Sequence, residues 1–235
     1  MGAGIARKFA VAGATICGCD LGAKDDDFTA LSTIYKVPVL YHQCDVTDKE
    51  ALAVLVQNII STFGRLDVLV SSAGANFFEG AAKCSENIWE QNMQLNLKSH
   101  WQLAKYCKPY LEKNKGVIIL MGSNHGNATM PGCFPYNITK SAVKSLVQTL
   151  AIEWGPAIRT VGLAPGFIDT PGNQKWFDSF EDSEQARKDT IRSHPVGRIG
   201  TPDEVGAWCV FLASDYSCFA SGTTYLLDGG RSALM

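Results

Sequence analysis

Residues 116–123, GVIILMGS, form an unbroken apolar run that ends in Gly and Ser. Such a run is typical of a strand in a parallel sheet, where both faces of the strand are buried. The next long pattern, PYNITKSAVKSLVQTLAIEW at residues 135–154, has apolar residues spaced as on one face of a helix. A strand followed by a helix is the repeating unit of parallel α/β folds, so this stretch predicts that fold class.

The same alternation of strand and helix continues toward both ends of the chain. It predicts strands at 14–20, 36–45, 65–74, 158–166 and 223–230, and helices from about residue 2 to Gly13 and at 49–64, 85–114 and 201–214. Thr47 or Asp48 would cap the helix at 49–64, and Thr201 with Pro202 would begin the last helix. The polar, turn-rich stretch 167–200 predicts an irregular lid. No linker or repeat interrupts the pattern, so residues 1–235 are predicted to form one doubly wound, Rossmann-like domain.

The bulk composition excludes several classes of protein. A chain of 235 residues with 46% apolar residues, 19% charged residues and a formal net charge of −2 is typical of a globular protein. It has no basic stripe for nucleic acid, no apolar run of about 18 residues for a membrane span, and no signal-peptide pattern. The eight cysteines are scattered without a CxxC pair, which favours thiols in the reducing cytoplasm and argues against a metal site.

Small and acidic residues follow the predicted strands, where a parallel sheet binds its ligands. The residues in question are Asp20, Asp45, Ser72 to Gly74, Ser123 and Pro165. A carboxylate at Asp20 can accept both hydroxyls of an adenosine ribose and would repel a 2′-phosphate. Because Leu21 follows, with no basic residue beside it, NAD is favoured over NADP; an ordinary turn aspartate is the alternative.

The strongest chemical pattern is CFPYNITK at residues 133–140. Tyr136 and Lys140 are four residues apart on the helix that follows Pro135, so they share a face. A nearby ammonium and the positive end of a helix both favour the phenolate, which predicts a lowered pKa for Tyr136 and a role as general acid and base. Ser123 could hydrogen-bond the same substrate oxygen, and Asn96 could hold a water near Lys140. An ordinary amphipathic helix with an exposed lysine is the alternative.

Taken together, these motifs resemble the short-chain dehydrogenase/reductase family. The matching stretches run in the family's order along nearly the whole chain: DVT at 45–47, SSAG at 71–74, LNLKS at 95–99, Ser123, YNITK at 136–140, APGFIDT at 164–170, PVGRIGTPDEVG at 195–206 and SGTTYLLDGG at 221–230.

The resemblance implies roles for individual residues. Asn96, Ser123, Tyr136 and Lys140 would be catalytic, and Lys140 would also hold the nicotinamide ribose. The other expected cofactor-binding residues are Gly2, Asp20, Leu21, Asp45, Val46, Ser72, Ala73, Gly74, Pro165, Gly166, Ile168 and Thr170. Among them, Asp20 would take the adenosine ribose, Asp45 and Val46 would flank the adenine, and Ile168 and Thr170 would hold the carboxamide. The resemblance also implies a homo-oligomer, a tetramer or a dimer.

Two features depart from the family pattern. The family's Asn-Asn-Ala-Gly is Ser71-Ser72-Ala73-Gly74, which loses amide hydrogen bonds to the cofactor. Gly2 aligns with the last glycine of the family's Thr-Gly-x-x-x-Gly-x-Gly turn, so the chain lacks that turn and the strand before it. We therefore expect an N-terminally truncated fold with a gap in the sheet between the strands ending at Asp20 and Ser71.

The sequence leaves the function open among three hypotheses. The favoured one is oxidation or reduction of a secondary alcohol or ketone on a sugar, polyol or other small polar molecule, because Asn124 and His125 follow Ser123 and the lid carries many charges. The second is reduction of a 3-oxoacyl thioester. The third is a catalytically silent relative that binds a partner or senses a dinucleotide, which the missing glycine turn favours.

Overall fold

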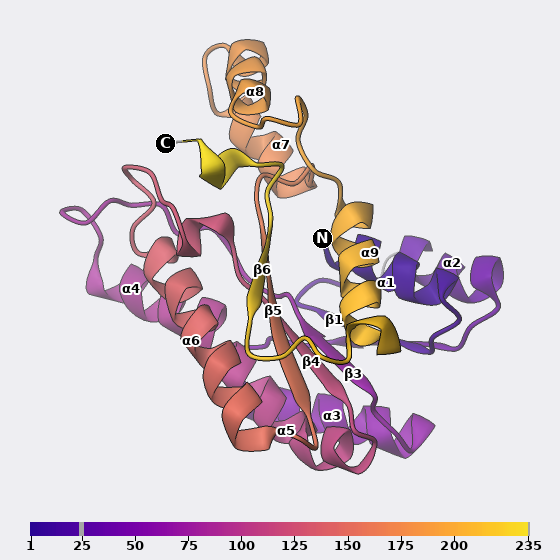
Figure 1. The fold of residues 1–235 in the computed structure, drawn as a ribbon. Coiled ribbons are helices and arrows are strands. Elements are labelled where there is room, and N and C mark those ends of the chain that lie inside the picture. Colours follow the sequence, from indigo (N-terminus) through magenta and orange to yellow (C-terminus); the bar gives the residue numbers. More distant parts are fainter. Residues whose placement is uncertain (24–25, 235) are drawn as a thin grey trace.

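Two parallel sheets lie at the centre of the fold, with helices on both sides (Figure 1). The computed structural model describes residues 1–23 and 26–234. Its strands are β1 (Ile16–Asp20), β2 (Val39–Gln43), β3 (Val68–Ser71), β4 (Val117–Met121), β5 (Arg159–Pro165) and β6 (Thr224–Leu227). Its α-helices are α1 (Gly2–Val11), α2 (Asp26–Tyr35), α3 (Lys49–Phe63), α4 (Glu86–Met93), α5 (Ser99–Lys113), α6 (Tyr136–Trp154), α7 (Pro171–Asp178), α8 (Ser183–Arg192) and α9 (Pro202–Ala213).

The strands form a two-stranded sheet, β1-β2, and a four-stranded sheet, β3-β4-β5-β6. Every pair in both sheets is parallel, which confirms the predicted fold class. Within the described residues no strand lies between β1 and β3. The expected gap in the sheet is therefore present.

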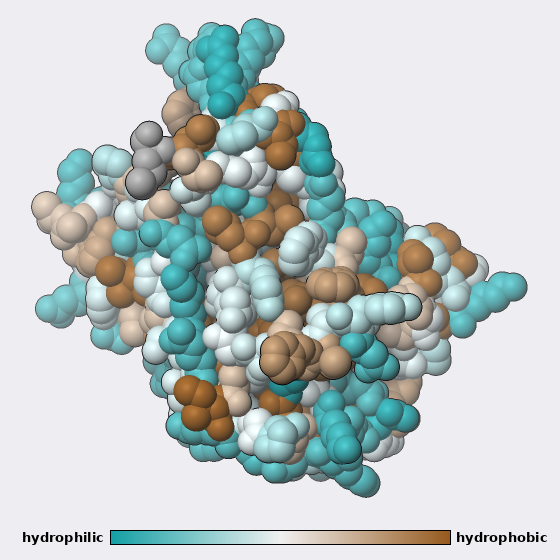
Figure 2. Space-filling view, in the orientation of Figure 1, coloured by the Kyte–Doolittle hydropathy of each residue, from teal (hydrophilic) through white to brown (hydrophobic). Residues whose placement is uncertain are grey.

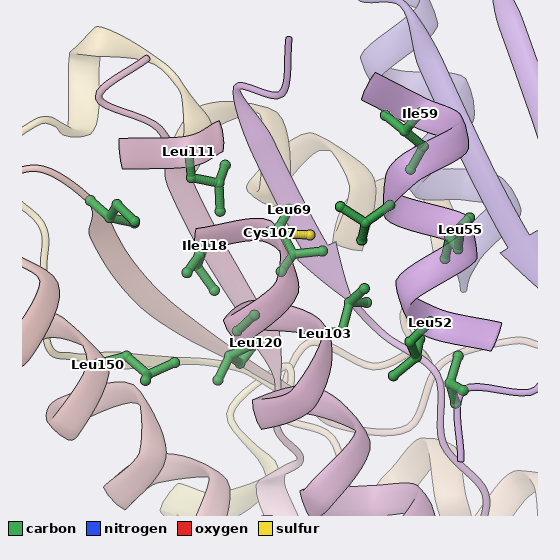
Figure 3. Close-up of a cluster of buried hydrophobic side chains, with 14 of the residues drawn as sticks. Leu52, Leu55, Ile59, Leu69, Leu103, Cys107, Leu111, Ile118, Leu120 and Leu150 are labelled. Carbon is green, nitrogen blue, oxygen red and sulfur yellow. The ribbon is translucent and has the colours of Figure 1, made fainter. Parts of the chain in front are cut away.

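Alternate residues of β4 face two separate hydrophobic clusters. Ile118 and Leu120 belong to a cluster shared with α3, α5 and α6, whereas Ile119 and Met121 belong to one shared with α1 and α9. Figure 3 shows the first cluster, with Leu120 beside the α5 residue Leu103. The period of two places one helix layer on each face of the sheet, as unbroken apolar strands require.

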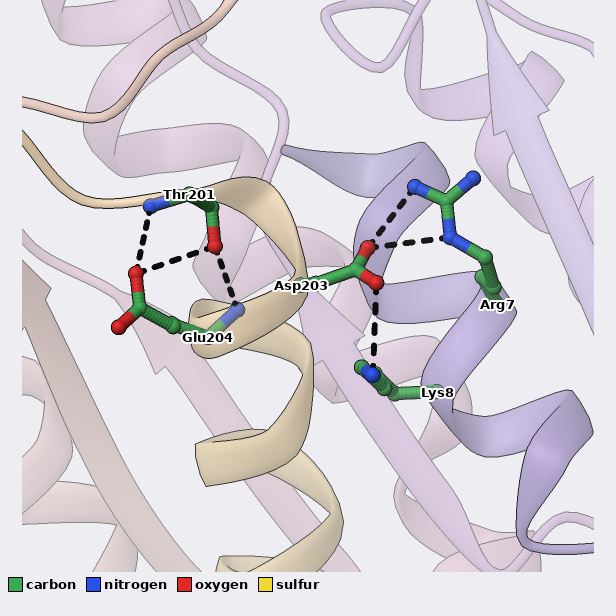
Figure 4. A network of polar contacts seen from close by, with 5 residues as sticks. All are labelled: Arg7, Lys8, Thr201, Asp203 and Glu204. Atoms are coloured by element: carbon green, nitrogen blue, oxygen red, sulfur yellow. Dashed lines mark hydrogen bonds and ion pairs between the residues drawn. The ribbon is translucent and has the colours of Figure 1, made fainter.

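Helix ends follow the sequence signals. Asp48 caps α3, accepting from Glu50 N at 2.8 Å. At the start of α9, Thr201 and Glu204 form a reciprocal capping box, with Thr201 N donating to Glu204 Oε2 at 2.9 Å (Figure 4). Pro202 occupies the first turn of the same helix, where its missing N–H leaves no intrahelical bond unmade.

Helices α1 and α9 pack closely because glycines face each other across their contact. A Cβ at Gly4 would lie 2.5 Å from the Pro202 backbone, and one at Gly206 would lie 2.5 Å from Gly4 O. Arg7 adds an ion pair to Asp203 at 2.8 Å at this interface (Figure 4). These contacts attach the N-terminal helix to the four-stranded half of the molecule.

The prediction of an irregular lid at 167–200 is wrong, because α7 and α8 lie within that stretch. Thr170 caps α7 and Asp182 caps α8, each through a hydrogen bond to a backbone N–H. Figure 2 shows α8 as a hydrophilic tip at the top of the view, with apolar residues gathered at its base. The sequence of α8 lacks the apolar periodicity that would have predicted a helix, because α8 is polar nearly all round.

Two other elements differ from the sequence expectations. Helix α2 was not predicted; its buried residue is Leu31, so its apolar stripe is short. The long helix expected at 85–114 is present but contains a π-helical turn, η1 (Gln94–Lys98), between α4 and α5. Short 3-10 turns complete the structure: η2 (Asn124–Gly126), η3 (Asp215–Ser217) and η4 (Arg231–Ala233). Among the residues described, none of the helices combines the length and apolar character needed to cross a membrane.

Candidate active site

A cavity of about 2260 Å³ lies at the carboxyl ends of the strands and extends between the two sheets. Of the residues predicted from the sequence, those that line it are Gly2, Asp20, Leu21, Asp45, Val46, Ser72, Ala73, Gly74, Ser123, Tyr136, Pro165, Gly166, Ile168 and Thr170. Asn96 and Lys140 are buried behind its wall. The structure therefore brings residues between positions 2 and 170 together around one cavity.

Tyr136 is the first residue of α6 and is 9% exposed. Its ring packs edge-on against Phe78, with the ring centroids 5.4 Å apart. One turn further along, the Lys140 Nζ lies 5.5 Å from the centre of the Tyr136 ring and donates to Met121 O at 3.0 Å. The expected pairing of tyrosine and lysine on one helix face is present, although the lysine is buried and not exposed.

Ser123 follows β4 and lies beside Tyr136. Its Oγ accepts from His125 N at 3.2 Å and donates to Asn124 Oδ1 at 3.3 Å. A hydrogen bond between Ser123 and the Tyr136 side chain favours the phenolate. Two hydroxyl groups thus meet at the cavity wall, where one substrate oxygen could contact both.

The predicted lowering of the Tyr136 pKa is wrong for this structure. Burial raises the pKa of Tyr136 to about 12, and the hydrogen bond from Ser123 opposes that rise. Burial also lowers the pKa of Lys140 to about 8. The charge of Lys140 alone would favour the phenolate, but burial removes the water around both side chains. At neutral pH, Tyr136 is therefore a neutral phenol that can act as a proton donor.

Asn96 lies in the π-helical turn and holds the loop that follows β3. Its Oδ1 accepts from Ala75 N at 3.1 Å, and its Nδ2 donates to Ala75 O at 2.9 Å. A Cβ at Gly74 would lie 2.6 Å from Asn96 Oδ1 and 3.6 Å from Lys140 Nζ, so only glycine fits between them. The predicted role of Asn96 in holding a water remains a prediction.

The sequence analysis missed Asn92, which connects this loop to α6. Asn92 is fully buried; its Oδ1 accepts from Asn96 Nδ2 at 2.9 Å, and its Nδ2 donates to Pro135 O at 3.0 Å. The signal that could have found it is a second asparagine one helical turn before Asn96. Asn92 thereby fixes the backbone just before Tyr136.

The residues predicted to bind the adenosine end of the cofactor differ in their surroundings: Asp20 lies at a strand end and Asp45 in a turn. Asp20 is exposed at the end of β1, and its Oδ1 accepts from Gly22 N at 3.0 Å. Asp45 Oδ1 accepts from both Thr47 N and Thr47 Oγ1, which is an ordinary aspartate turn. Val46 is buried.

Near the expected nicotinamide end, the predicted residues also stabilise the fold. Ile168 is buried, and Thr170 Oγ1 accepts from Asn173 N at 3.3 Å to cap α7. A Cβ at Gly166 would lie 2.7 Å from the Asp228 Cβ, so a side chain cannot be accommodated. All three residues, Gly166, Ile168 and Thr170, line the cavity and can contact a ligand there.

The residues that line the cavity suit the adenosine ribose and the diphosphate of a nicotinamide dinucleotide. Exposed Asp20 can accept ribose hydroxyls, and small residues at Ser72, Ala73 and Gly74 leave room for a close approach. The diphosphate would meet the first turn of α1, which also lines the cavity at Met1 and Gly2. Burial lowers the pKa of the Met1 amine, while nearby Asp20 opposes that shift.

Among the described residues no group of three or more His, Cys, Asp or Glu side chains is arranged to hold a metal ion.

Comparison with known proteins identifies the class. Residues 1–232 match the family model described as enoyl-(acyl carrier protein) reductase. The chain is 32% identical over 238 residues to a probable 2,4-dienoyl-CoA reductase of Bacillus subtilis, covering 98% of this chain and 92% of the relative. It is 33% identical over 233 residues to L-fucose dehydrogenase of Bos taurus, covering 98% and 84%.

The fold agrees with these relatives. The ligand-free structure of Thermoplasma acidophilum aldohexose dehydrogenase matches with a TM-score of 0.90 and 25% identity, covering 100% of this chain and 91% of that one. The chain belongs to the short-chain dehydrogenase/reductase family. Its relatives are oxidoreductases of small molecules, named as dehydrogenases or reductases.

Proposed function

We propose that this chain is an NAD-dependent oxidoreductase that interconverts a secondary alcohol and a ketone on a sugar, polyol or other small polar carbonyl compound. The observation that carries the proposal is the meeting of Tyr136 and Ser123 at one cavity wall, with Lys140 buried one helical turn behind. This arrangement supplies a proton donor, a hydrogen-bond donor and a positive charge around one oxygen position.

A bound nicotinamide would deliver hydride to the substrate carbonyl or accept it from the alcohol. In the reducing direction the neutral phenol of Tyr136 gives its proton to the carbonyl oxygen as negative charge develops there. Ser123 donates a hydrogen bond to the same oxygen and fixes its position. The Lys140 cation stabilises the phenolate that remains. Asn92 and Asn96 hold the loop and helix start that keep these groups in place.

Residues along the cavity are proposed to hold the cofactor. Asp20 would bind the adenosine ribose, Asp45 and Val46 would flank the adenine, and Lys140 would bind the nicotinamide ribose. Ile168 and Thr170 would bind the carboxamide. Asp20, followed by the uncharged Leu21, supports NAD over NADP, because a 2′-phosphate would meet a carboxylate and no cation.

Polar groups around Ser123 support a polar substrate. Asn124, His125 and Arg231 line the cavity beside Tyr136. The L-fucose and aldohexose dehydrogenases among the relatives also carry sugar names. A second candidate is a 3-oxoacyl thioester, favoured by Phe78, Met130 and Trp176 on the same walls and by the acyl thioester names among the comparisons.

We also propose a homo-oligomer, a tetramer or a dimer, in the cytoplasm. Trp101 on α5 and Ile138 and Ile152 on α6 are exposed, Ile152 to 81%, so both helices offer apolar surface beyond what the sheet covers. The cysteines are free thiols, as in a reducing compartment. A monomeric mass by light scattering at micromolar concentration would contradict the oligomer.

The test of the proposed reaction is a cofactor and substrate panel. Purified chain is incubated with NAD or NADP and a set of polyols and aldohexoses, and with NADH or NADPH and an acetoacetyl thioester. We expect NADH to form with a polyol or sugar. Turnover with the thioester alone would select the second candidate. Tight NADH binding without turnover on any compound would select a silent, dinucleotide-sensing relative.

A further inference from the structure

Arg231 brings a positive charge to the cavity wall that also carries Ser123 and Tyr136. Of the described residues after position 122 that line the cavity, Arg231 is the one charged at neutral pH. His125 on the same wall is neutral there, because burial lowers the pKa of its ring. A substrate held at the proposed site of proton transfer therefore meets a cation on this wall and no carboxylate.

A rigid turn fixes the position of Arg231 at the start of η4. Asp228 is buried; its Oδ1 accepts from Gly230 N at 3.0 Å, and its Oδ2 accepts from Ser232 N at 2.8 Å. Both carboxylate oxygens are thus used by the backbone of the turn and not by the guanidinium. The turn sets the point from which the Arg231 side chain reaches the cavity.

The Arg231 guanidinium has no partner that matches its charge. Its Nη2 donates to Met130 Sδ at 3.1 Å, and a thioether sulfur is a weak acceptor. Within residues 1–23 and 26–234, none of the ion pairs involves Arg231. Burial lowers the pKa of Arg231, so the cation has lost water without gaining an anion. An anionic ligand would compensate that loss.

His125 connects Arg231 with the proposed site of proton transfer. Burial and, second, the charge of Arg231 lower the pKa of His125, so the guanidinium lies near that ring. The His125 ring centroid is 6.2 Å from that of Tyr136, and His125 N donates to Ser123 Oγ at 3.2 Å. One small molecule can therefore reach both the two hydroxyl groups and the guanidinium.

We propose that Arg231 is a specificity-determining residue that binds a carboxylate of the substrate, which makes the preferred substrate a sugar acid, a polyhydroxy carboxylate, over a neutral sugar or polyol. This inference rests on the proposed oxidoreductase function and narrows its substrate class. The reacting secondary hydroxyl lies at Tyr136 and Ser123, and Asn124 and His125 offer neutral polar groups to the other hydroxyls. The carboxylate takes no part in the bond changes: the alcohol and NAD give the ketone, NADH and one proton.

A single guanidinium favours a carboxylate over a phosphate ester. Its planar fork of N–H donors matches the two oxygens of a carboxylate. One positive charge balances one carboxylate, whereas a phosphate monoester carries a charge of about −1.5 to −2 at pH 7. No second cation comes from the described residues after position 122 that line the cavity. A sugar phosphate is therefore an alternative for the test to exclude.

The test compares compounds that share a carbon chain and differ in charge. The purified chain is titrated, with and without NAD, with D-gluconate, its amide and sorbitol, with D-galacturonate and D-galactose, and with D-glucose 6-phosphate. Calorimetry measures binding, and NADH absorbance measures turnover. We expect the carboxylates to bind about tenfold or more tightly than their neutral counterparts, with the difference in turnover mainly in KM.

Two variants test whether Arg231 causes this preference. Arg231→Gln removes the charge and should raise Kd and KM for the acids about 10–100-fold, with little change in kcat or in the values for neutral compounds. Arg231→Lys should recover part of the loss. Arg192→Gln is the matched control, because Arg192 pairs with Asp189 on α8 and is absent from the cavity lining. Thermal unfolding checks that each variant is folded.

The outcomes separate this inference from the proposed function. Turnover of neutral sugars without a preference for acids, or unchanged acid binding in Arg231→Gln, would overturn the inference and leave the oxidoreductase function in place. Acid binding that depends on Arg231, without turnover of any compound, would support the carboxylate site and refute the proposed reaction. Binding of no acid, or tighter binding of the phosphate ester, would overturn the sugar-acid substrate. If Arg231→Gln does not fold, the comparison of gluconate with its amide on the unaltered chain still decides.

Discussion

The four-stranded half of this molecule and its two-stranded half differ in how well they are packed. In β4 every residue is buried, and Ile118, Ile119 and Leu120 are fully inaccessible. In β1 only Ile16 is buried, and β2 has no buried residue. The small cluster behind β1 contains Ala10, Ile16, Leu31 and Val37.

This difference coincides with a division of chemical roles. Ser123 follows β4, and Tyr136 and Lys140 lie on α6, so the proposed proton transfer depends on the fully buried strand β4 and the helix packed against it. Asp20, at the end of β1, and Asp45, just after β2, are proposed for the adenosine end of the cofactor and belong to the two-stranded half.

The largest expected effect concerns the chemistry of the packed half. Tyr136→Phe removes the proton donor and should lower turnover by about 10²–10⁴-fold with little change in the free energy of unfolding. Tyr110→Phe on α5, a tyrosine packed against the core away from the cavity, is the matched control. Steady-state kinetics measure both. Near-normal turnover in the Tyr136 variant would remove this residue from the mechanism.

A pair of leucine substitutions compares the packing of the two halves directly. Leu120→Ala in β4 should destabilise the fold by about 2–5 kcal/mol, because Leu120 is fully buried. Leu40→Ala in β2 should cost about 1 kcal/mol, because Leu40 is only partly buried. Urea unfolding of both variants measures the difference. Equal losses would show that the two halves are equally well packed.

The buried His100 makes the packed half sensitive to acid. It is fully buried on α5, its Nδ1 lies 2.6 Å from Ser71 Oγ, and burial lowers its pKa from 6.5 to about 3. Between these values the unfolded chain binds the proton more strongly, so stability falls as the pH falls. The loss should reach about 3 kcal/mol from pH 6.5 to pH 4.

His100→Gln should reduce this pH dependence, although the variant is less stable at pH 7. Urea unfolding at several pH values measures the slope for both proteins. An unchanged slope in the variant would assign the acid sensitivity to other groups.

At the less packed half, Asp20→Ala should reduce the preference for NAD over NADP by about tenfold, which corresponds to about 1.4 kcal/mol. The expected reason is the loss of hydrogen bonds to the ribose and of repulsion toward a 2′-phosphate. Asp48→Ala is the control, because it removes the α3 cap and lowers stability without touching the proposed ribose position. Paired titrations at equal salt measure the ratio, and a wild-type chain that binds NADPH more tightly contradicts the assignment.

The smallest expected effect is at the contact between α1 and α9. Asp203→Asn removes the ion pairs to Arg7 and Lys8, whose side chains are partly exposed (Figure 4). The hydrogen bond from Arg7 is the main cause of the lowered pKa of Asp203, so its contribution is lost as the pH falls toward that pKa. We expect a loss of about 0–1 kcal/mol at pH 7 that decreases with added salt. A loss of several kcal/mol would mean that this ion pair, and not the glycine contact, holds α1 in place.

The strand pattern and the helix caps could be predicted from the sequence because they depend on neighbouring residues. The apolar runs at 116–123 and 158–166 became β4 and β5, and Asp48 and Thr201 cap the helices as expected. Helices α2, α7 and α8 were missed. Each has few buried residues, so the apolar period that reveals a helix is weak there.

The sequence by itself determined which residues meet at the candidate site, since residues that follow parallel strands lie at one edge of the sheet. Only the tertiary structure decided their protonation, because the pKa values of Tyr136 and Lys140 depend on how much water the surrounding chain excludes. It also decided the contact of Asn92 with the backbone of Pro135. Desolvation and this hydrogen bond both depend on residues distant in sequence, so no local pattern of residues specifies them.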